Sequence, residues 1–159
     1  MKLYGKLLKT DGPPIVILVR LFVGTIFISE GLQKFLYTME LGAGRFAKIG
    51  IPYPNVMAPF VGVVEVTCGA LLLLGLFTRL AAVPLIITML VAIISTKIPI
   101  LLGYGFWGFR LGAVPSYGFW SMAHEMRTDW ALLLGSTFLL IIGAGKWSVD
   151  ACLASKKGA

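Results

Sequence analysis

The sequence predicts an all-α integral membrane protein, a bundle of four membrane-spanning helices in one domain over residues 1–159. Three observations predict this fold class. Hydrophobic residues make up 58% of the 159-residue chain. Charged residues make up 13%, against ~25% in a typical soluble domain. The mean hydropathy is +0.90, and a chain this short cannot bury enough of its own surface to hide so much apolar area from water. The bilayer must supply the remaining apolar environment.

The net charge of +7 would suggest nucleic-acid binding in a soluble protein. Here the cations lie mostly at the edges of apolar segments, where lipid headgroups and membrane orientation favour them. No basic run is longer than Lys156-Lys157. We therefore exclude nucleic acid and expect the lipid bilayer and other membrane or membrane-associated subunits as partners.

The first span is predicted over residues 14–37. Pro13 and Pro14 suit a helix start, where no backbone partner is lost. Arg20 interrupts what could be the core of a signal peptide, and no small-residue cleavage site follows. We therefore expect an uncleaved helix, long enough to cross the ~30 Å hydrocarbon layer.

The next spans are predicted over residues 58–77 and 80–96. A loop with glycines and prolines precedes them, with a short helix expected around Arg45–Ile49. Only Thr78 and Arg79 separate the two spans, so they should form an antiparallel hairpin whose backbone groups are satisfied internally. The fourth span is predicted over residues 126–143, with an upstream polar extension and a short basic tail behind it.

A loop rich in aromatic residues and glycine is predicted over residues 97–125. Two interpretations stay open. The loop can be a lid over a small-molecule site, since long loops in compact proteins are usually functional. It can also be an aromatic belt at the level of the lipid headgroups.

An even number of spans puts both termini on one side of the membrane. The lysines and arginines favour cytoplasmic termini by eight to six. The eight are Lys2, Lys6, Lys9, Arg20, Arg79, Lys146, Lys156 and Lys157. We expect a bacterial or archaeal cytoplasmic membrane.

Two glycine-bearing helix faces each carry ionisable groups that are costly inside a bilayer. Positions three and four apart share a helix face, and glycines on such a face let helices approach closely. The faces are therefore expected to pack together. One comprises Arg20, Gly24, Phe27, Gly31 and Lys34, and the other Gly62, Glu65 and Gly69.

Depth in the membrane limits which charges can pair. At ~1.5 Å per residue, Glu30, Lys34 and Glu65 fall in the external half and should form a polar cluster. This cluster either fixes helix register, binds a polar headgroup such as a quinone carbonyl, or relays protons. The polar start of the fourth span enters from the same side and would complete it with His124, Glu125, Arg127 and Asp129.

Arg20 lies too far along the helix axis to reach Glu65, so it should find backbone carbonyls, lipid phosphate or Asp150. The two cysteines, Cys68 and Cys152, are far apart and form no C-x-x-C motif. With a single histidine, His124, no intrachain pair of histidine ligands for a haem exists. We assign no catalytic residue, no metal ligand and no covalently bound cofactor, and we expect a quinone or a lipid as the bound molecule.

Several stretches resemble the DoxX family of small membrane proteins. The first is R-L-F-V-G-T-I-F-I-S-E-G-L-Q-K at Arg20–Lys34, followed by G-I-P-Y-P at Gly50–Pro54. The sequence at Gly62–Arg79 and the segment from Arg127 to Asp150 are also similar. The resemblance implies a four-helix membrane bundle related to the DoxD subunit of thiosulfate:quinone oxidoreductase. The matching polar positions are Arg20, Lys34, Glu65 and Asp129, whereas the aromatic segment Gly103–Trp120 departs from the family's pattern.

Three functions remain open. The chain can be the membrane subunit of a quinone-linked oxidoreductase whose redox centres lie on a partner, so that it has no catalytic activity alone. It can be a purely structural subunit of a larger membrane complex. It can also be a carrier of a small molecule or of protons, although four spans are few for alternating access.

Overall fold

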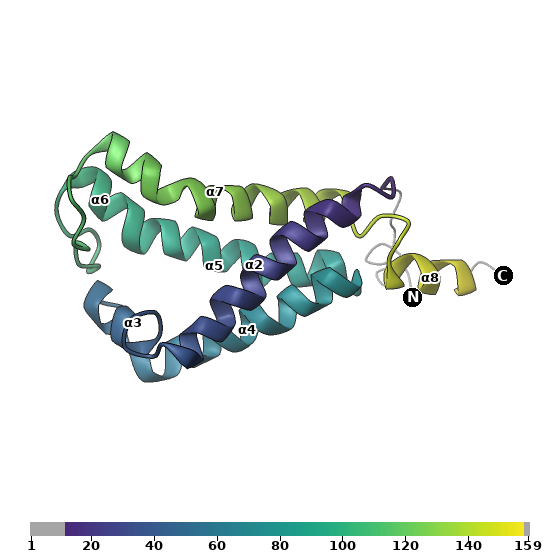
Figure 1. Ribbon diagram of the computed structural model, residues 1–159, viewed down its shortest axis with the longest axis horizontal. Coiled ribbons are helices and arrows are strands. Elements are labelled where there is room, and N and C mark those ends of the chain that lie inside the picture. Colours follow the sequence, from purple (N-terminus) through teal and green to yellow (C-terminus); the bar gives the residue numbers. More distant parts are fainter. Residues whose placement is uncertain (1–11, 158–159) are drawn as a thin grey trace.

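The computed structural model describes residues 12–157, which form helices joined by turns and loops and contain no strand (Figure 1). The basic residues Lys2, Lys6 and Lys9 lie outside this range. The elements in chain order are α2 (Val16–Leu36), α3 (Ala43–Ile49), α4 (Pro54–Leu74), α5 (Thr78–Ala92), the π-helix η1 (Ile93–Lys97), α6 (Ile98–Leu102), α7 (Phe119–Ile142) and α8 (Val149–Lys157).

Three helical segments are long and apolar enough to cross a membrane by length and composition: Val16–Leu36, Pro54–Leu74 and Thr78–Leu102. The last is one continuous run of α5, η1 and α6. Helix α7 has 24 residues, but its first half carries the polar group His124–Asp129. It is therefore not among the candidate spans.

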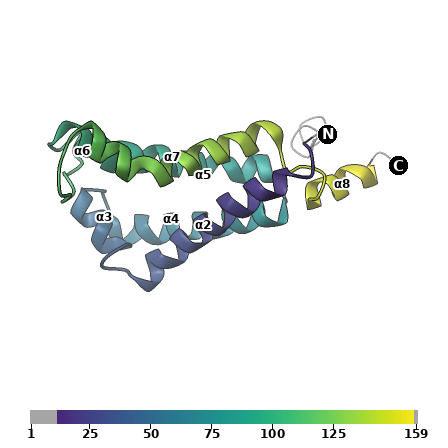
Figure 2. The ribbon, with the colours of Figure 1, turned by 45° about the horizontal axis from the view of Figure 1, so that its top comes forward.

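The long helices lie in two pairs, α2 with α4 and α5 with α7 (Figures 1 and 2). The pairs converge near α8 and separate toward α3 and α6. Between α2 and α4 the glycines permit close contact. A Cβ added to Gly24 would lie 2.9 Å from the carbonyl oxygen of Gly69, and one added to Gly31 would lie 2.7 Å from that of Gly62.

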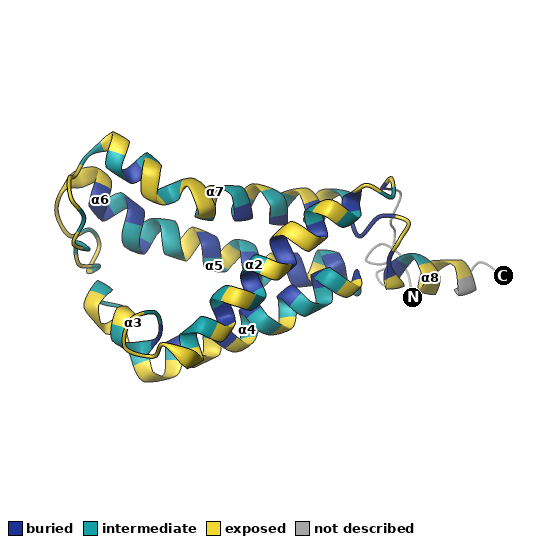
Figure 3. Ribbon diagram, viewed as in Figure 1, coloured by how far each residue is buried: buried dark blue, intermediate teal, exposed yellow. Residues whose placement is uncertain are grey.

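The core lies between the long helices. Its buried side chains include Phe27, Leu72, Leu85, Leu132 and Leu139, and buried residues line the inward faces of the long helices in Figure 3. Many large apolar side chains face outward instead, such as Phe22, Phe60 and Ile87. An outer surface of this kind suits lipid.

The observed helix bounds differ from the expected ones. Helix α4 begins at Pro54, which tolerates the first helical position, and ends at Leu74, because the next residue, Gly75, has a φ of 65° that stops the helix. The loop expected over 97–125 is shorter, because the chain is helical to Leu102 and again from Phe119. The expected short helix near residue 45 is confirmed as α3, and the expected basic tail is helical as α8.

The aromatic loop between α6 and α7 reaches across the open end of the molecule. The amide of Arg110 donates to the carbonyl of Ile49 in α3 at 2.8 Å. Phe106 and Phe109 pair through their backbones, and Trp107 at the tip is 82% exposed. The loop thus joins the two helix pairs and still presents aromatic side chains outward.

Candidate functional site

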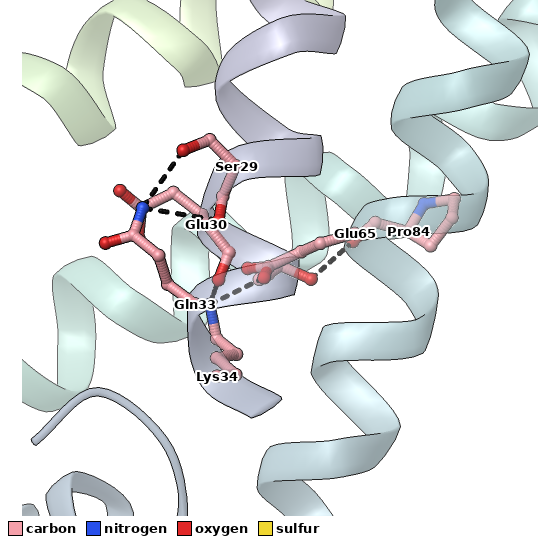
Figure 4. A network of polar contacts seen from close by, with 7 residues as sticks. Ser29, Glu30, Gln33, Lys34, Glu65 and Pro84 are labelled. Carbon is pink, nitrogen blue, oxygen red and sulfur yellow. Dashed lines mark hydrogen bonds and ion pairs between the residues drawn. The ribbon is translucent and has the colours of Figure 1, made fainter. Parts of the chain in front are cut away.

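An ion pair joins α2 to α4 where the helix pairs begin to separate. Lys34 Nζ lies 2.5 Å from Glu65 Oε2, and the two side chains are 11% and 2% exposed. The ammonium also donates to the backbone carbonyl of Glu30 at 3.3 Å. Figure 4 shows Lys34 and Glu65 pointing toward each other across the helix interface.

Close packing of α2 and α4 brings this pair together. The Cβ position of Gly31 lies 3.0 Å from that of Glu65, so a larger residue at 31 would push Glu65 away. Glu65 follows Gly62 by three residues and therefore lies on the same face of α4. The glycine face that permits the approach thus also buries the carboxylate.

Glu30 belongs to the site by position. Its backbone carbonyl contacts Lys34, and its side chain is half-buried along the wall of a cavity. Beside it on α2, Gln33 Nε2 donates to Ser29 Oγ at 3.0 Å (Figure 4). These contacts lie within one helix, and Glu30 is among the residues that line the cavity.

The cavity has a volume of about 550 Å³ and lies between the two helix pairs at their open end. Side chains of α2, α3, α4, α5, η1 and α7 line it, and most of its wall is apolar. Ionisable groups interrupt the apolar wall at Glu30, Lys34, Arg45, Glu65, Lys97, Glu125 and Asp129.

A second ion pair lies on the opposite helix pair. Lys97 Nζ of η1 lies 3.3 Å from Asp129 Oδ2 of α7, and the side chains are 9% and 21% exposed. Sequence reasoning identified Asp129 but missed Lys97, which it placed at the start of the loop expected over residues 97–125. The apolar run Ile98–Leu102 directly after Lys97 could have revealed it, because that run extends the helix past Lys97.

The start of α7 divides into two faces. Glu125, Thr128, Asp129 and Leu132 follow helical spacing and line the cavity. His124 and Arg127 are exposed and lie elsewhere on the helix, where Arg127 Nη1 is 3.1 Å from His124 Nδ1. The structure thus brings Glu125 and Asp129 to the cavity and leaves His124 and Arg127 at the surface.

Arg20 lies at the converging end and is 2% exposed. Its guanidinium donates to four backbone carbonyls rather than to lipid phosphate. These are Leu72 at 2.8 Å, Leu73 at 2.6 Å, Ala144 at 3.2 Å and Trp147 at 2.5 Å. Arg20 therefore connects α2 to the end of α4 and to the segment between α7 and α8.

Asp150 completes this arrangement without pairing directly with Arg20. Its carboxylate accepts from the amides of Phe77 at 2.8 Å and Thr78 at 3.1 Å, which open α5. Its own amide donates to the carbonyl of Gly75 at 2.9 Å. The charge therefore satisfies a helix N-terminus, where negative groups are favoured.

Within the part of the chain that the structure describes, no group of three or more His, Cys, Asp or Glu side chains could hold a metal ion. Cys68 is half-buried in α4 and Cys152 is exposed in α8. The ionisable side chains on the cavity wall offer hydrogen bonds and charge.

Comparison with known proteins identifies the family. The sequence profile of the DoxX family matches residues 15–98. The chain belongs to the DoxX family. It is 51% identical to the uncharacterized membrane protein Rv3486 of Mycobacterium tuberculosis over 96% of this chain and 90% of that protein.

A second relative is CatD of Bacillus subtilis, which is named as a candidate oxidoreductase. It is 37% identical over 52% of this chain and 59% of CatD. No solved structure matches this chain significantly. Family, relatives and helices together establish a membrane protein.

Proposed function

We propose that this DoxX protein is a four-helix membrane subunit of a quinone-linked oxidoreductase, and that its cavity holds the quinone headgroup. The observation that carries the proposal is the cavity itself. Its volume of about 550 Å³ lies within the ~300–1,000 Å³ typical of small-molecule sites. Such sites combine apolar walls with a few placed polar groups, as this wall does.

The cavity is accessible to a lipophilic molecule. Phe60 of α4 and Ile87 and Val91 of α5 line it, and all three side chains are exposed. We place the opening of the cavity between α4 and α5, where these exposed side chains lie. In a bilayer this opening faces lipid, which is where a quinone with an isoprenoid tail is dissolved.

The ion pair would bind and orient the headgroup. Lys34 donates hydrogen bonds, and Glu65 fixes the position of its ammonium. A charged donor makes a stronger hydrogen bond to a carbonyl than a neutral donor does. In this proposal the electrons come from a redox centre on a partner protein, and this chain supplies anchorage and the quinone pocket. CatD, the candidate oxidoreductase among the relatives, supports this role.

The proposed topology adds α7 as a fourth span and places both termini in the cytoplasm. The polar start of α7 would then lie at the external end. There Asp129 is paired with Lys97, and His124 and Arg127 are exposed. Helix α8 would lie at the cytoplasmic end.

A purely structural subunit is the second candidate. The buried Arg20 network favours it, because every hydrogen bond of that guanidinium joins one segment of this chain to another. A role in holding helices together needs no ligand. It leaves unexplained a cavity that carries two ion pairs.

The test is extraction of the tagged protein from native membranes in mild detergent, followed by mass spectrometry of the proteins that co-purify. A stoichiometric flavin, haem or rhodanese-like partner supports the oxidoreductase subunit. A Glu65→Gln variant then separates the two candidates, with Glu40→Gln, an exposed carboxylate, as the control. Intact assembly with lost electron transfer to quinone supports the pocket, whereas lost assembly supports the structural role. Recovery of this chain alone contradicts both subunit proposals.

A further inference from the structure

The second ion pair, Lys97 with Asp129, adds a polar group that the proposed headgroup site does not use. Lys97 is 7% exposed, so its charge is held away from water at the wall of the cavity. It ends the π-helix Ile93–Lys97. Short π-helical turns are rare and are frequent at functional sites.

Both ammonium groups retain hydrogen-bonding capacity. A lysine ammonium has three N–H donors. Among residues 12–157, Lys34 Nζ contacts the Glu65 carboxylate and the Glu30 carbonyl, and Lys97 Nζ contacts the Asp129 carboxylate. Each therefore keeps at least one donor without a protein acceptor. A buried donor left unsatisfied is destabilising, so a ligand acceptor at either position would be stabilising.

The two donors lie on different walls. Lys34 and Glu65 join α2 to α4, whereas Lys97 and Asp129 join η1 to α7. These are the two helix pairs that separate at the open end (Figures 1 and 2). Apolar side chains line the cavity between them, including Val61, Val64 and Ala92.

We infer that the cavity recognises its ligand at two opposite edges, with one acceptor at Lys34 and a second at Lys97. The ligand class is a flat, lipophilic ring with two carbonyl oxygens across the ring from each other, as in a 1,4-quinone. This inference rests on the proposed quinone site and adds its second contact. Lys97 is then a specificity-determining residue, and Asp129 holds its ammonium in place.

The test compares two probes by calorimetric titration of the purified full-length protein in detergent. The first is a 2-alkyl-1,4-naphthoquinone, and the second is the matched 1-tetralone, which has one carbonyl. The variants are Lys97→Met and, as a matched control, Lys48→Met on the exposed face of α3. All proteins share one detergent, so partitioning of the probe cancels between them.

The expected result is a loss of affinity for the quinone alone, in the Lys97 variant alone. Lys97→Met weakens quinone binding at least about tenfold, because the charged donor to the second carbonyl is lost. It leaves tetralone binding unchanged, and Lys48→Met changes neither. Equal affinity of the wild-type protein for both probes would overturn the inference without any variant, even if Lys97→Met fails to fold.

The outcomes separate the two proposals. Tight quinone binding that Lys97→Met does not alter overturns the second contact and leaves the headgroup site intact. No quinone binding by the wild-type protein overturns the headgroup site itself. The variant Asp129→Asn keeps the Lys97 donors, so it should retain the preference for quinone over tetralone, and loss of that preference counts against the inference.

Discussion

The two ends of the molecule use the same kinds of charged side chain in opposite ways. At the converging end, Arg20 donates to four backbone carbonyls and Asp150 accepts from two backbone amides. At the open end, Lys34 and Lys97 each pair with one carboxylate and border a cavity. The first arrangement satisfies its charges with the chain's own backbone. The second leaves donors that only a further molecule can satisfy.

This contrast teaches how to interpret buried charge in a membrane helix. An intramembrane ionisable residue suggests function by default, yet Arg20 is occupied in joining helix ends. The number of protein partners, rather than burial alone, distinguishes the two ends. Arg20 and Glu65 are both 2% exposed, and only Glu65 lies beside a cavity.

Arg20→Met should produce the largest effect on stability. It removes the donor to four carbonyls at once, and we expect the free energy of unfolding to fall by about 3 kcal/mol or more. Arg20→Lys should recover only part of this loss, because an ammonium cannot reproduce the planar array of donors. Unfolding in mixed SDS micelles measures both. If Arg20→Met is as stable as the wild-type protein, then Arg20 does not hold the converging end together, and the contrast between the two ends fails.

Gly31→Ala should come next. The new Cβ would lie 2.7 Å from the carbonyl oxygen of Gly62, and overpacking of this kind costs about 1–3 kcal/mol. Because the same contact positions Glu65, quinone affinity should fall as well. Gly112→Ala is the matched control, since nothing lies within 4 Å of a Cβ there. Equal effects of the two substitutions would contradict the close packing of α2 and α4.

Asp150→Asn should destabilise the protein by about 1 kcal/mol, because a neutral amide oxygen is a weaker acceptor at the N-terminus of α5. It should leave quinone affinity unchanged, since Asp150 lies at the converging end. Unfolding and calorimetric titration of the same preparation report the two quantities. A change in affinity at unchanged stability would show that the two ends are not independent.

His124→Ala and Arg127→Ala should have the smallest effects. Both side chains are exposed and face away from the cavity, and surface substitutions usually change stability by less than about 0.5 kcal/mol. Quinone affinity should also be unchanged. A clear loss of binding in either variant would extend the site beyond the cavity wall.

The sequence predicted what helical spacing controls. Gly24, Gly31, Gly62 and Gly69 recur at intervals that place them on one face of each helix, and depth along the helices brought Lys34 near Glu65. Sequence reasoning could not assign the faces of α7, because it expected residues before 126 only as a polar extension of the span and grouped His124, Glu125, Arg127 and Asp129 together. In the structure α7 begins at Phe119, so residues 124–129 all follow helical spacing. Glu125 and Asp129 then share the face that lines the cavity.

Partners distant in the chain were beyond the reach of sequence reasoning. The carbonyls that accept from Arg20 come from the end of α4 and from the segment between α7 and α8, and a carbonyl has no signature in the sequence. Lys97 was missed because a lysine after an apolar run normally marks a membrane boundary. Its burial depends on Asp129 from another helix, which is a tertiary contact.

Photoaffinity labelling tests the central claim most directly. A photoreactive quinone analogue is added to the protein in native membranes, and the labelled peptides are mapped by mass spectrometry. The account predicts labelling of the cavity wall on α4 and α5, near Val64 and Ile87, with loss of labelling when excess unmodified quinone competes. Labelling confined to the converging end near Arg20, or labelling that excess quinone does not displace, would contradict a quinone site in this cavity.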